Sequence, residues 1–116
     1  MSGYGSHQAG LAAEEAVARA YVDLGYGERA RRWRGPSGEI DFIAEKAGKL
    51  VFVEVKYARD HATAAARVNR AKAARLMAAA AGYLAAEGLS QDTECALDVA
   101  LVDPMGRVEL LRDAFV

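Results

Sequence analysis

Four charged side chains in two neighbouring apolar segments are the residues of this chain best suited to chemistry. They are Glu39, Asp41, Glu54 and Lys56. Carboxylates held close together bind hard divalent cations such as Mg²⁺, which takes one or two carboxylates together with water and phosphate oxygens. A lysine beside a bound cation can position a water molecule or stabilise developing negative charge. Such chemistry requires a fold that brings the four side chains together.

The two segments that carry these charges are predicted to form a β-hairpin. Residues 40–43 and 50–55 are rich in β-branched and aromatic side chains, and Ala47-Gly48-Lys49 separates them. A turn centred between the first two residues of this separator pairs residues whose numbers sum to about 95. Asp41 then lies across from Glu54.

In the same register Glu39 lies across from Lys56, and period-two alternation puts all four charges on one face of the hairpin. The apolar residues expected on that face are Ile43, Leu50 and Phe52. Those expected on the opposite face are Ile40, Phe42, Val51, Val53 and Val55. Strands this apolar are typical of a sheet covered on both faces.

Two opposed carboxylates in such a sheet repel each other and need a compensating charge. A divalent cation held by Asp41 and Glu54 would supply it, with Lys56 beside the metal. The alternative is a solvated salt-bridge cluster in which Lys56 neutralises Glu39 and the other carboxylates face water. Spacing alone does not separate the two interpretations, because structural ion pairs gather in similar places.

A further acid belongs to the first predicted helix, residues 10–24, which Gly25 is expected to end. The apolar residues that recur there at helical spacing are Leu11, Val17, Ala18, Tyr21 and Leu24. At 100° per residue, Glu14 falls near the middle of this stripe. It is therefore expected to point toward the sheet or, if the helix is slightly rotated, to lie at the rim of the stripe.

An arginine-rich segment precedes the hairpin. Residues 28–34 are predicted to form a short strand, and its basic and aromatic residues are Arg29, Arg31, Arg32, Trp33 and Arg34. Positive charge beside metal ligands suits a polyanion such as a phosphodiester backbone. The alternative is a solvated edge strand whose charges prevent pairing with another strand.

The rest of the chain predicts one long helix, after a loop at residues 58–63 and ending near residue 87, and strands at residues 94–102 and 107–112. Asp98, inside the first of these strands, is expected to have a hydrogen-bonded structural role. The order of helix, three strands, helix and two strands predicts a mixed α/β domain with helices packed on a central sheet.

Length and composition fit one globular domain. The chain has 116 residues, of which 53% are hydrophobic and 27% charged. Residues 1–9 are predicted to be a flexible tail unlike a signal peptide, which leaves residues 10–116 as the domain and the cytoplasm as the default location. No apolar run approaches a membrane span, so no membrane is expected as a partner. The net charge of -1 means that any nucleic-acid binding must rely on local basic patches.

These residues and their spacing resemble the YraN family of bacterial predicted nucleases. That family is similar to the archaeal Holliday-junction resolvases and to the wider PD-(D/E)xK restriction-endonuclease-like superfamily. The resemblance covers nearly the whole chain after the tail. The motifs that carry it are Gly10-x-x-x-Glu14, Gly25-Tyr26, Gly38-Glu39-Ile40-Asp41, Val51-Phe52-Val53-Glu54-Val55-Lys56, Lys72 and Ala114-Phe115.

The resemblance implies a restriction-endonuclease-like sheet flanked by helices and an active site that binds Mg²⁺ or Mn²⁺. By motif position, Asp41 and Glu54 would be metal ligands, and Lys56 would position or activate water. Glu14 would complete the catalytic and metal site, with Glu39 as an accessory residue. The residues expected to bind nucleic acid are Arg31, Arg32, Arg34 and Lys72.

The implied function is metal-dependent hydrolysis of phosphodiester bonds in DNA, with branched or structured DNA as candidate substrates. A homodimer is a candidate assembly, because resolvases act as dimers on two-fold symmetric junctions. One alternative is a non-catalytic nucleic-acid-binding or adaptor domain that uses Arg31, Arg32 and the helix face from Arg67 to Arg75. Another is a structural subunit with the hairpin edge or the long helix as its interface.

Overall fold

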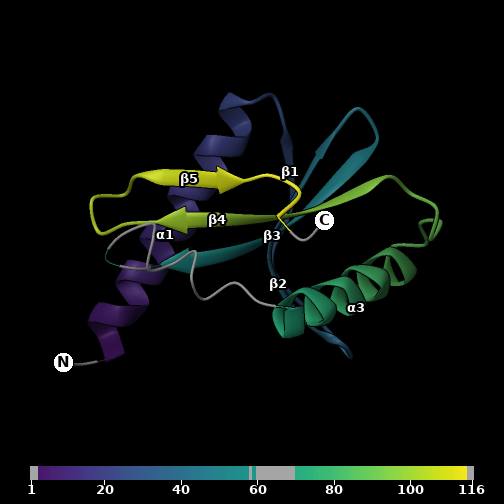
Figure 1. Ribbon diagram of the computed structural model, residues 1–116, viewed down its shortest axis with the longest axis horizontal. Coiled ribbons are helices and arrows are strands. Elements are labelled where there is room, and N and C mark those ends of the chain that lie inside the picture. The colour runs from purple at the N-terminus through teal and green to yellow at the C-terminus, as the bar shows by residue number, and fades with distance from the viewer. Residues whose placement is uncertain (1–2, 58, 60–69, 115–116) are drawn as a thin grey trace.

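The computed structural model describes residues 3–57, 59 and 70–114, with the backbone alone for residues 3–9. The elements along the chain are α1 (Gly3–Asp23), β1 (Gly27–Gly35), β2 (Gly38–Lys46), β3 (Lys49–Tyr57), α3 (Arg70–Ala86), β4 (Cys95–Val102) and β5 (Val108–Leu111) (Figure 1). This is the predicted order of helix, three strands, helix and two strands. Within the described part of the chain, no helix has both the length and the apolar character needed to cross a bilayer.

Two predicted boundaries differ from the structure or fall outside it. Helix α1 begins at Gly3 and not at residue 10, because the polar, glycine-containing residues before that point give no apolar period from which a helix could be predicted. The expected first turns of the long helix, including Arg67, lie outside the described residues. The division into a tail and one domain stays a prediction.

The strands form one five-stranded mixed sheet in the order β1-β2-β3-β4-β5. Among the described strands only the pair β3 and β4 is parallel, and α3 lies in the connection between them, as a parallel pair requires. Strand β1 is an edge strand, as the second interpretation of the arginine-rich segment proposed. The mixed α/β class is confirmed, and the arrangement is compatible with a restriction-endonuclease-like fold.

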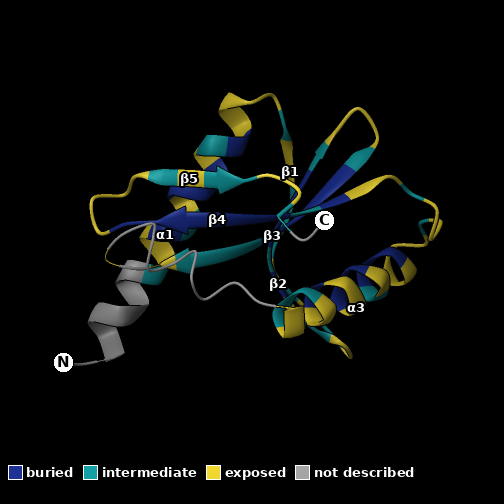
Figure 2. Ribbon diagram, in the orientation of Figure 1, coloured by how far each residue is buried: buried dark blue, intermediate teal, exposed yellow. Residues whose placement is uncertain are grey.

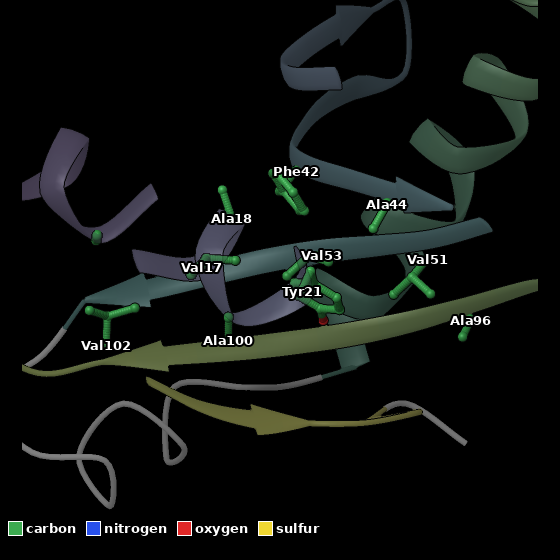
Figure 3. Packing of buried hydrophobic residues seen from close by; sticks show 11 residues of the cluster. Val17, Ala18, Tyr21, Phe42, Ala44, Val51, Val53, Ala96, Ala100 and Val102 are labelled. Atoms are coloured by element: carbon green, nitrogen blue, oxygen red, sulfur yellow. The ribbon is translucent and has the colours of Figure 1, made fainter. Parts of the chain in front are cut away.

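The sheet is covered on both faces by apolar clusters, one with each helix. Cluster residues on the α1 side are Ala13, Val17, Ala18, Tyr21, Phe42, Ala44, Val51, Val53, Ala96, Ala100 and Val102 (Figure 3). Cluster residues on the α3 side are Ile40, Ile43, Leu50, Phe52, Leu76, Ala79, Ala80, Tyr83 and Leu84. Neighbours along β3 alternate between the two clusters, so the helices lie on opposite faces. Figure 2 shows the buried residues concentrated in the central strands and on the inner side of α3.

The hairpin has the predicted register. Its ladder runs from Lys46 paired with Lys49 to Phe42 paired with Val53. The turn residues Ala47 and Gly48 have φ values of 53° and 81°. Positive φ at both central residues is the type I′ pattern, whose twist matches that of paired strands.

The face predicted for Ile40 is wrong. This side chain packs with Ile43 against α3, although strict alternation would put the two on opposite faces. The ladder between β1 and β2 pairs Trp33 with Ile40 but passes over Arg32 and Asp41. Arg32 has a φ of 50°, a left-handed conformation that is uncommon for a residue with a side chain. The alternation is therefore interrupted at Arg32 and Asp41, where a period-two pattern cannot anticipate it.

The structural role predicted for Asp98 is confirmed. Its buried carboxylate accepts hydrogen bonds from the Tyr21 hydroxyl at 2.7 Å and from the backbone N–H of Asp113 at 3.0 Å. Arg112 forms an ion pair with it at 2.8 Å. Asp98 thus joins α1, β4 and the segment that follows β5.

Candidate active site

A polar cavity of about 150 Å³ lies between the sheet and α3. The residues that line it are Glu39, Asp41, Glu54, Lys72, Arg75 and Leu76. The structure thus brings together three of the four charges that the hairpin was expected to group. The volume is sufficient for a small cation and some of its water ligands.

A larger cavity of about 320 Å³ lies between α3 and the start of β4. Its lining is mainly apolar and includes Met77, Leu84 and Leu97. Catalysis depends on charged groups that converge on one point, and these line the smaller cavity. The smaller cavity is therefore the candidate active site.

Asp41 lies at the point where β2 and β3 separate. The ladder between them ends at Phe42 and Val53, one pair before the expected pairing of Asp41 with Glu54. The side chain of Asp41 reaches across this opening, and its Oδ2 accepts a hydrogen bond from the backbone N–H of Val55 at 2.8 Å. The carboxylate is therefore held beside β3 at the position of Glu54.

Negative charge is concentrated at Asp41. Burial raises the pKa of its carboxyl to about 6 against the opposing effect of the Val55 hydrogen bond, and the charges of Glu54, Glu39 and Glu14 raise it further. Carboxylates from both strands of the hairpin and from α1 thus act on one point. This excess of negative charge favours binding of a cation.

Lys56 lies beside Glu54 and forms an ion pair with it at 3.2 Å. The salt-bridge interpretation instead joined Lys56 to Glu39, but Glu39 pairs with Arg34 across the β1–β2 ladder at 3.4 Å. Lys72 of α3 is a neighbour of Lys56, whose ammonium group holds the pKa of Lys72 below its ordinary value. The basic groups of the site therefore come from both β3 and α3.

Glu14 does not line the cavity, and its side chain is directed to Arg32 of β1 and not to bulk solvent. Both of its carboxylate oxygens accept hydrogen bonds from Nε of Arg32 at 2.9 Å, and its side chain is 17% exposed. Its charge contributes to the raised pKa of Asp41. The expectation that Glu14 points toward the sheet is thus met at its edge strand, where the carboxylate is largely sheltered and ion-paired to Arg32.

The residues present fit a divalent cation bound by two carboxylates. Asp41 and Glu54 line one cavity, and Mg²⁺ fills its remaining coordination positions with water and phosphate oxygens. Among the residues that the structure describes, no three His, Cys, Asp or Glu side chains are grouped closely enough to hold a metal ion. Glu14 as a further ligand stays a prediction, and it requires that its bond to Arg32 open.

The arginines of β1 are paired within the chain. Arg31 forms hydrogen bonds with Glu28 of its own strand and Glu15 of α1, whereas Arg34 is 82% exposed. Trp33 packs edge-on against the ring of Tyr83 and is partly buried. The segment is thus largely neutralised, and its role in binding nucleic acid stays a prediction.

Sequence reasoning missed Arg75. The sequence named it only within the helix face that a non-catalytic nucleic-acid-binding domain would use, yet it lines the cavity together with Lys72. The two residues are three positions apart, a spacing that puts side chains on one face of a helix and could have indicated the pair. The cavity therefore has two basic residues of α3 opposite its carboxylates.

A family model described as the uncharacterised protein family UPF0102 matches residues 13–102. The chain belongs to the UPF0102 family. This family is the YraN-type, nuclease-like family that the motifs resemble. The matched stretch includes Glu14, Asp41, Glu54 and Lys56.

Curated UPF0102 proteins match between 77% and 99% of the chain in the three examples that follow. One from Cereibacter sphaeroides strain ATCC 17025 is 51% identical over 115 residues, which cover 99% of this chain and 98% of the relative. One from Ruegeria pomeroyi is 50% identical over 110 residues, covering 95% and 89%. One from Roseiflexus castenholzii is 44% identical over 91 residues, covering 77% and 73%. Their names state no activity, so function must be argued from the site.

Proposed function

We propose that this UPF0102 protein is a divalent-metal-dependent endonuclease that hydrolyses phosphodiester bonds in DNA. The observation that carries the proposal is the cavity in which Asp41 and Glu54 face Lys72 and Arg75. This hydrolysis needs carboxylates that can bind Mg²⁺ or Mn²⁺ and cationic side chains that can bind a phosphate, and the cavity has two of each. DNA as the substrate is supported by the YraN-type motifs, with branched or structured DNA as candidates.

Each residue has a role that follows from its contacts. Asp41, oriented by the N–H of Val55, and Glu54 hold the cation. A bound Mg²⁺ or Mn²⁺ would make the attacking water more acidic and would neutralise charge on the phosphate. Lys56, whose ammonium group lies 3.2 Å from Glu54, orients the attacking water and stabilises its deprotonated form.

Lys72 and Arg75 bind the phosphate from the side of α3. Their positive charges lie across the cavity from the acids, where negative charge increases during attack on phosphorus. The guanidinium of Arg75 can hold two phosphate oxygens at once, which fixes the orientation of the scissile bond. Removing either should weaken transition-state stabilisation more than it weakens folding.

The test is a cleavage assay with linear, nicked, flapped and four-way DNA in Mg²⁺, Mn²⁺ or EDTA. We expect cleavage that requires the metal and falls by about a hundredfold or more in Asp41→Asn and Glu54→Gln. The matched control is Glu94→Gln, because Glu94 has an exposed carboxylate on a loop that pairs only loosely, at 3.9 Å, with Lys49. This control should cleave like the wild-type protein.

Failure has two recognisable forms. If the wild-type protein binds the four-way DNA without cutting any of the four substrates, the nuclease proposal fails and the non-catalytic binding domain is supported. If cleavage occurs equally in EDTA, or survives in both Asp41→Asn and Glu54→Gln, the activity comes from another site or from a contaminant.

A further inference from the structure

Arg32, for which the sequence predicted only nucleic-acid binding, forms an ion pair with Glu14, the acid that is predicted to complete the metal site. Its Nε donates to both carboxylate oxygens of Glu14 at 2.9 Å. The hydrogen bond to Glu14 is the main reason that the pKa of Arg32 is raised, and the charges of Glu39 and Asp41 raise it further. The guanidinium therefore supplies a positive charge among acids that would otherwise repel one another.

The backbone at Arg32 is adapted to this position. Its φ of 50° lies in the left-handed region, and it coincides with the interruption of the β1–β2 ladder opposite Asp41. Such a conformation is strained for a residue with a side chain. An outlier of this kind at the edge of a candidate site points to a functional constraint on the side chain that it carries.

We propose that Arg32 is the resident counter-ion of the carboxylate site and that it competes with the divalent cation for Glu14. In the metal-free protein the guanidinium holds Glu14. When the cation binds, Glu14 turns to it and releases Arg32, whose planar donors then bind a phosphate of the substrate. The inference rests on the proposed metal-dependent function and adds how the site is held in the absence of metal.

The neighbouring ion pair provides a matched control. Arg31 pairs with Glu15 as Arg32 pairs with Glu14, so both pairs join β1 to α1. Arg31 also pairs with Glu28. The charge of Glu14 raises the pKa of Asp41, whereas Glu15 and Glu28 are not among the causes of that shift. Arg31→Gln nevertheless removes the same unit charge as Arg32→Gln. General attraction of a cation to a more negative protein therefore affects both variants, whereas release of Glu14 affects only one.

The experiment is calorimetric titration of the full chain with Mn²⁺ in the absence of DNA. We expect Arg32→Gln to bind Mn²⁺ about two- to fivefold more tightly than the wild-type protein, which is the range set by a half-exposed ion pair. Arg31→Gln should gain clearly less, because only the general effect of net charge acts in that variant. Glu14→Gln should bind more weakly, and adding Arg32→Gln to it should give no gain, because the gain depends on Glu14.

A second readout uses the wild-type protein and does not depend on the folding of any variant. The NMR signal of the Arg32 Nε–H should shift when Mg²⁺ is added, whereas that of Arg31 should not. If Arg32→Gln binds Mn²⁺ with equal or lower affinity, or if the Arg32 signal stays fixed while signals of Asp41 and Glu54 move, the competition is refuted and the metal site stands. If the wild-type protein binds no Mn²⁺, the metal site and the competition both fail.

Discussion

The carboxylate of Asp41 takes the place of a strand partner for Val55: it accepts a hydrogen bond from the backbone N–H of Val55 at 2.8 Å. The ladder between β2 and β3 ends just before Asp41, and the N–H that this ending leaves without a strand partner is the group that orients the Asp41 carboxylate. The same position is partly buried and faces other carboxylates, which is unfavourable for folding and useful for binding a cation.

Asp41→Asn should stabilise the metal-free protein at neutral pH. The pKa of Asp41 is raised from 3.8 to about 6 by burial and by neighbouring carboxylates. Between these values the folded protein keeps a proton that the unfolded chain has lost, so stability falls as pH rises through this window. Asparagine does not ionise and can still accept the Val55 N–H. We expect a gain of about 1–3 kcal/mol at pH 7.5 and none at pH 4, measured by urea denaturation in EDTA.

The control for this prediction is Asp103→Asn. Burial would raise the pKa of Asp103, but hydrogen bonds and the charge of Arg107, with a further hydrogen bond from Met105, hold it below its usual value. This carboxylate is therefore stabilising when ionised, and its replacement should lower stability at pH 7.5. If Asp41→Asn also loses stability at pH 7.5, the ionised carboxylate of Asp41 does not destabilise the fold, and the prediction is wrong.

Tyr21→Phe should destabilise the protein through Asp98. The Tyr21 hydroxyl donates to the fully buried carboxylate of Asp98 at 2.7 Å, and phenylalanine would leave that acceptor with one partner fewer. Loss of a hydrogen bond to a buried charged group costs about 1–3 kcal/mol. Chemical denaturation at pH 7 measures this change. Tyr26→Phe is the control, because the Tyr26 hydroxyl meets Arg112 in an exposed contact and should matter less.

Two glycine substitutions should have opposite effects. Gly82 lies within α3, and a Cβ there would meet the Trp33 ring at 3.7 Å, an ordinary contact. Gly82→Ala should therefore gain about 0.5–1 kcal/mol from helix propensity. A Cβ at Gly35 would clash with the same ring, which packs against Tyr83. Gly35→Ala should displace Trp33 and lower the melting temperature, and a stable Gly35→Ala variant would contradict this packing.

The sequence predicted the hairpin and its acids because short-range rules determine them. Alternation with period two and the turn at Ala47 and Gly48 fix the register without knowledge of the rest of the fold. The structural role of Asp98 was predicted in the same way, from a single acid among apolar strand residues. Its partners Tyr21 and Arg112 could not be predicted, because they come from distant parts of the chain.

The remaining features depend on tertiary contacts. The interruption at Arg32 that turns Ile40 toward α3 has no counterpart in a pattern of apolar residues. The pairing of Arg31 with Glu15 depends on how α1 lies against β1, so the run of arginines alone could not show that these charges have partners within the chain. Position in space, and not residue type, decides which charges remain for a ligand.

The most direct test of the central claim is a crystal of the protein soaked in Mn²⁺ and measured for anomalous scattering. We predict a peak in the cavity at about 2.0–2.3 Å from carboxylate oxygens of both Asp41 and Glu54, and its loss in a crystal of Glu54→Gln. A peak elsewhere, or no peak at Asp41 and Glu54 at millimolar Mn²⁺, would contradict a metal-dependent active site in this UPF0102 protein.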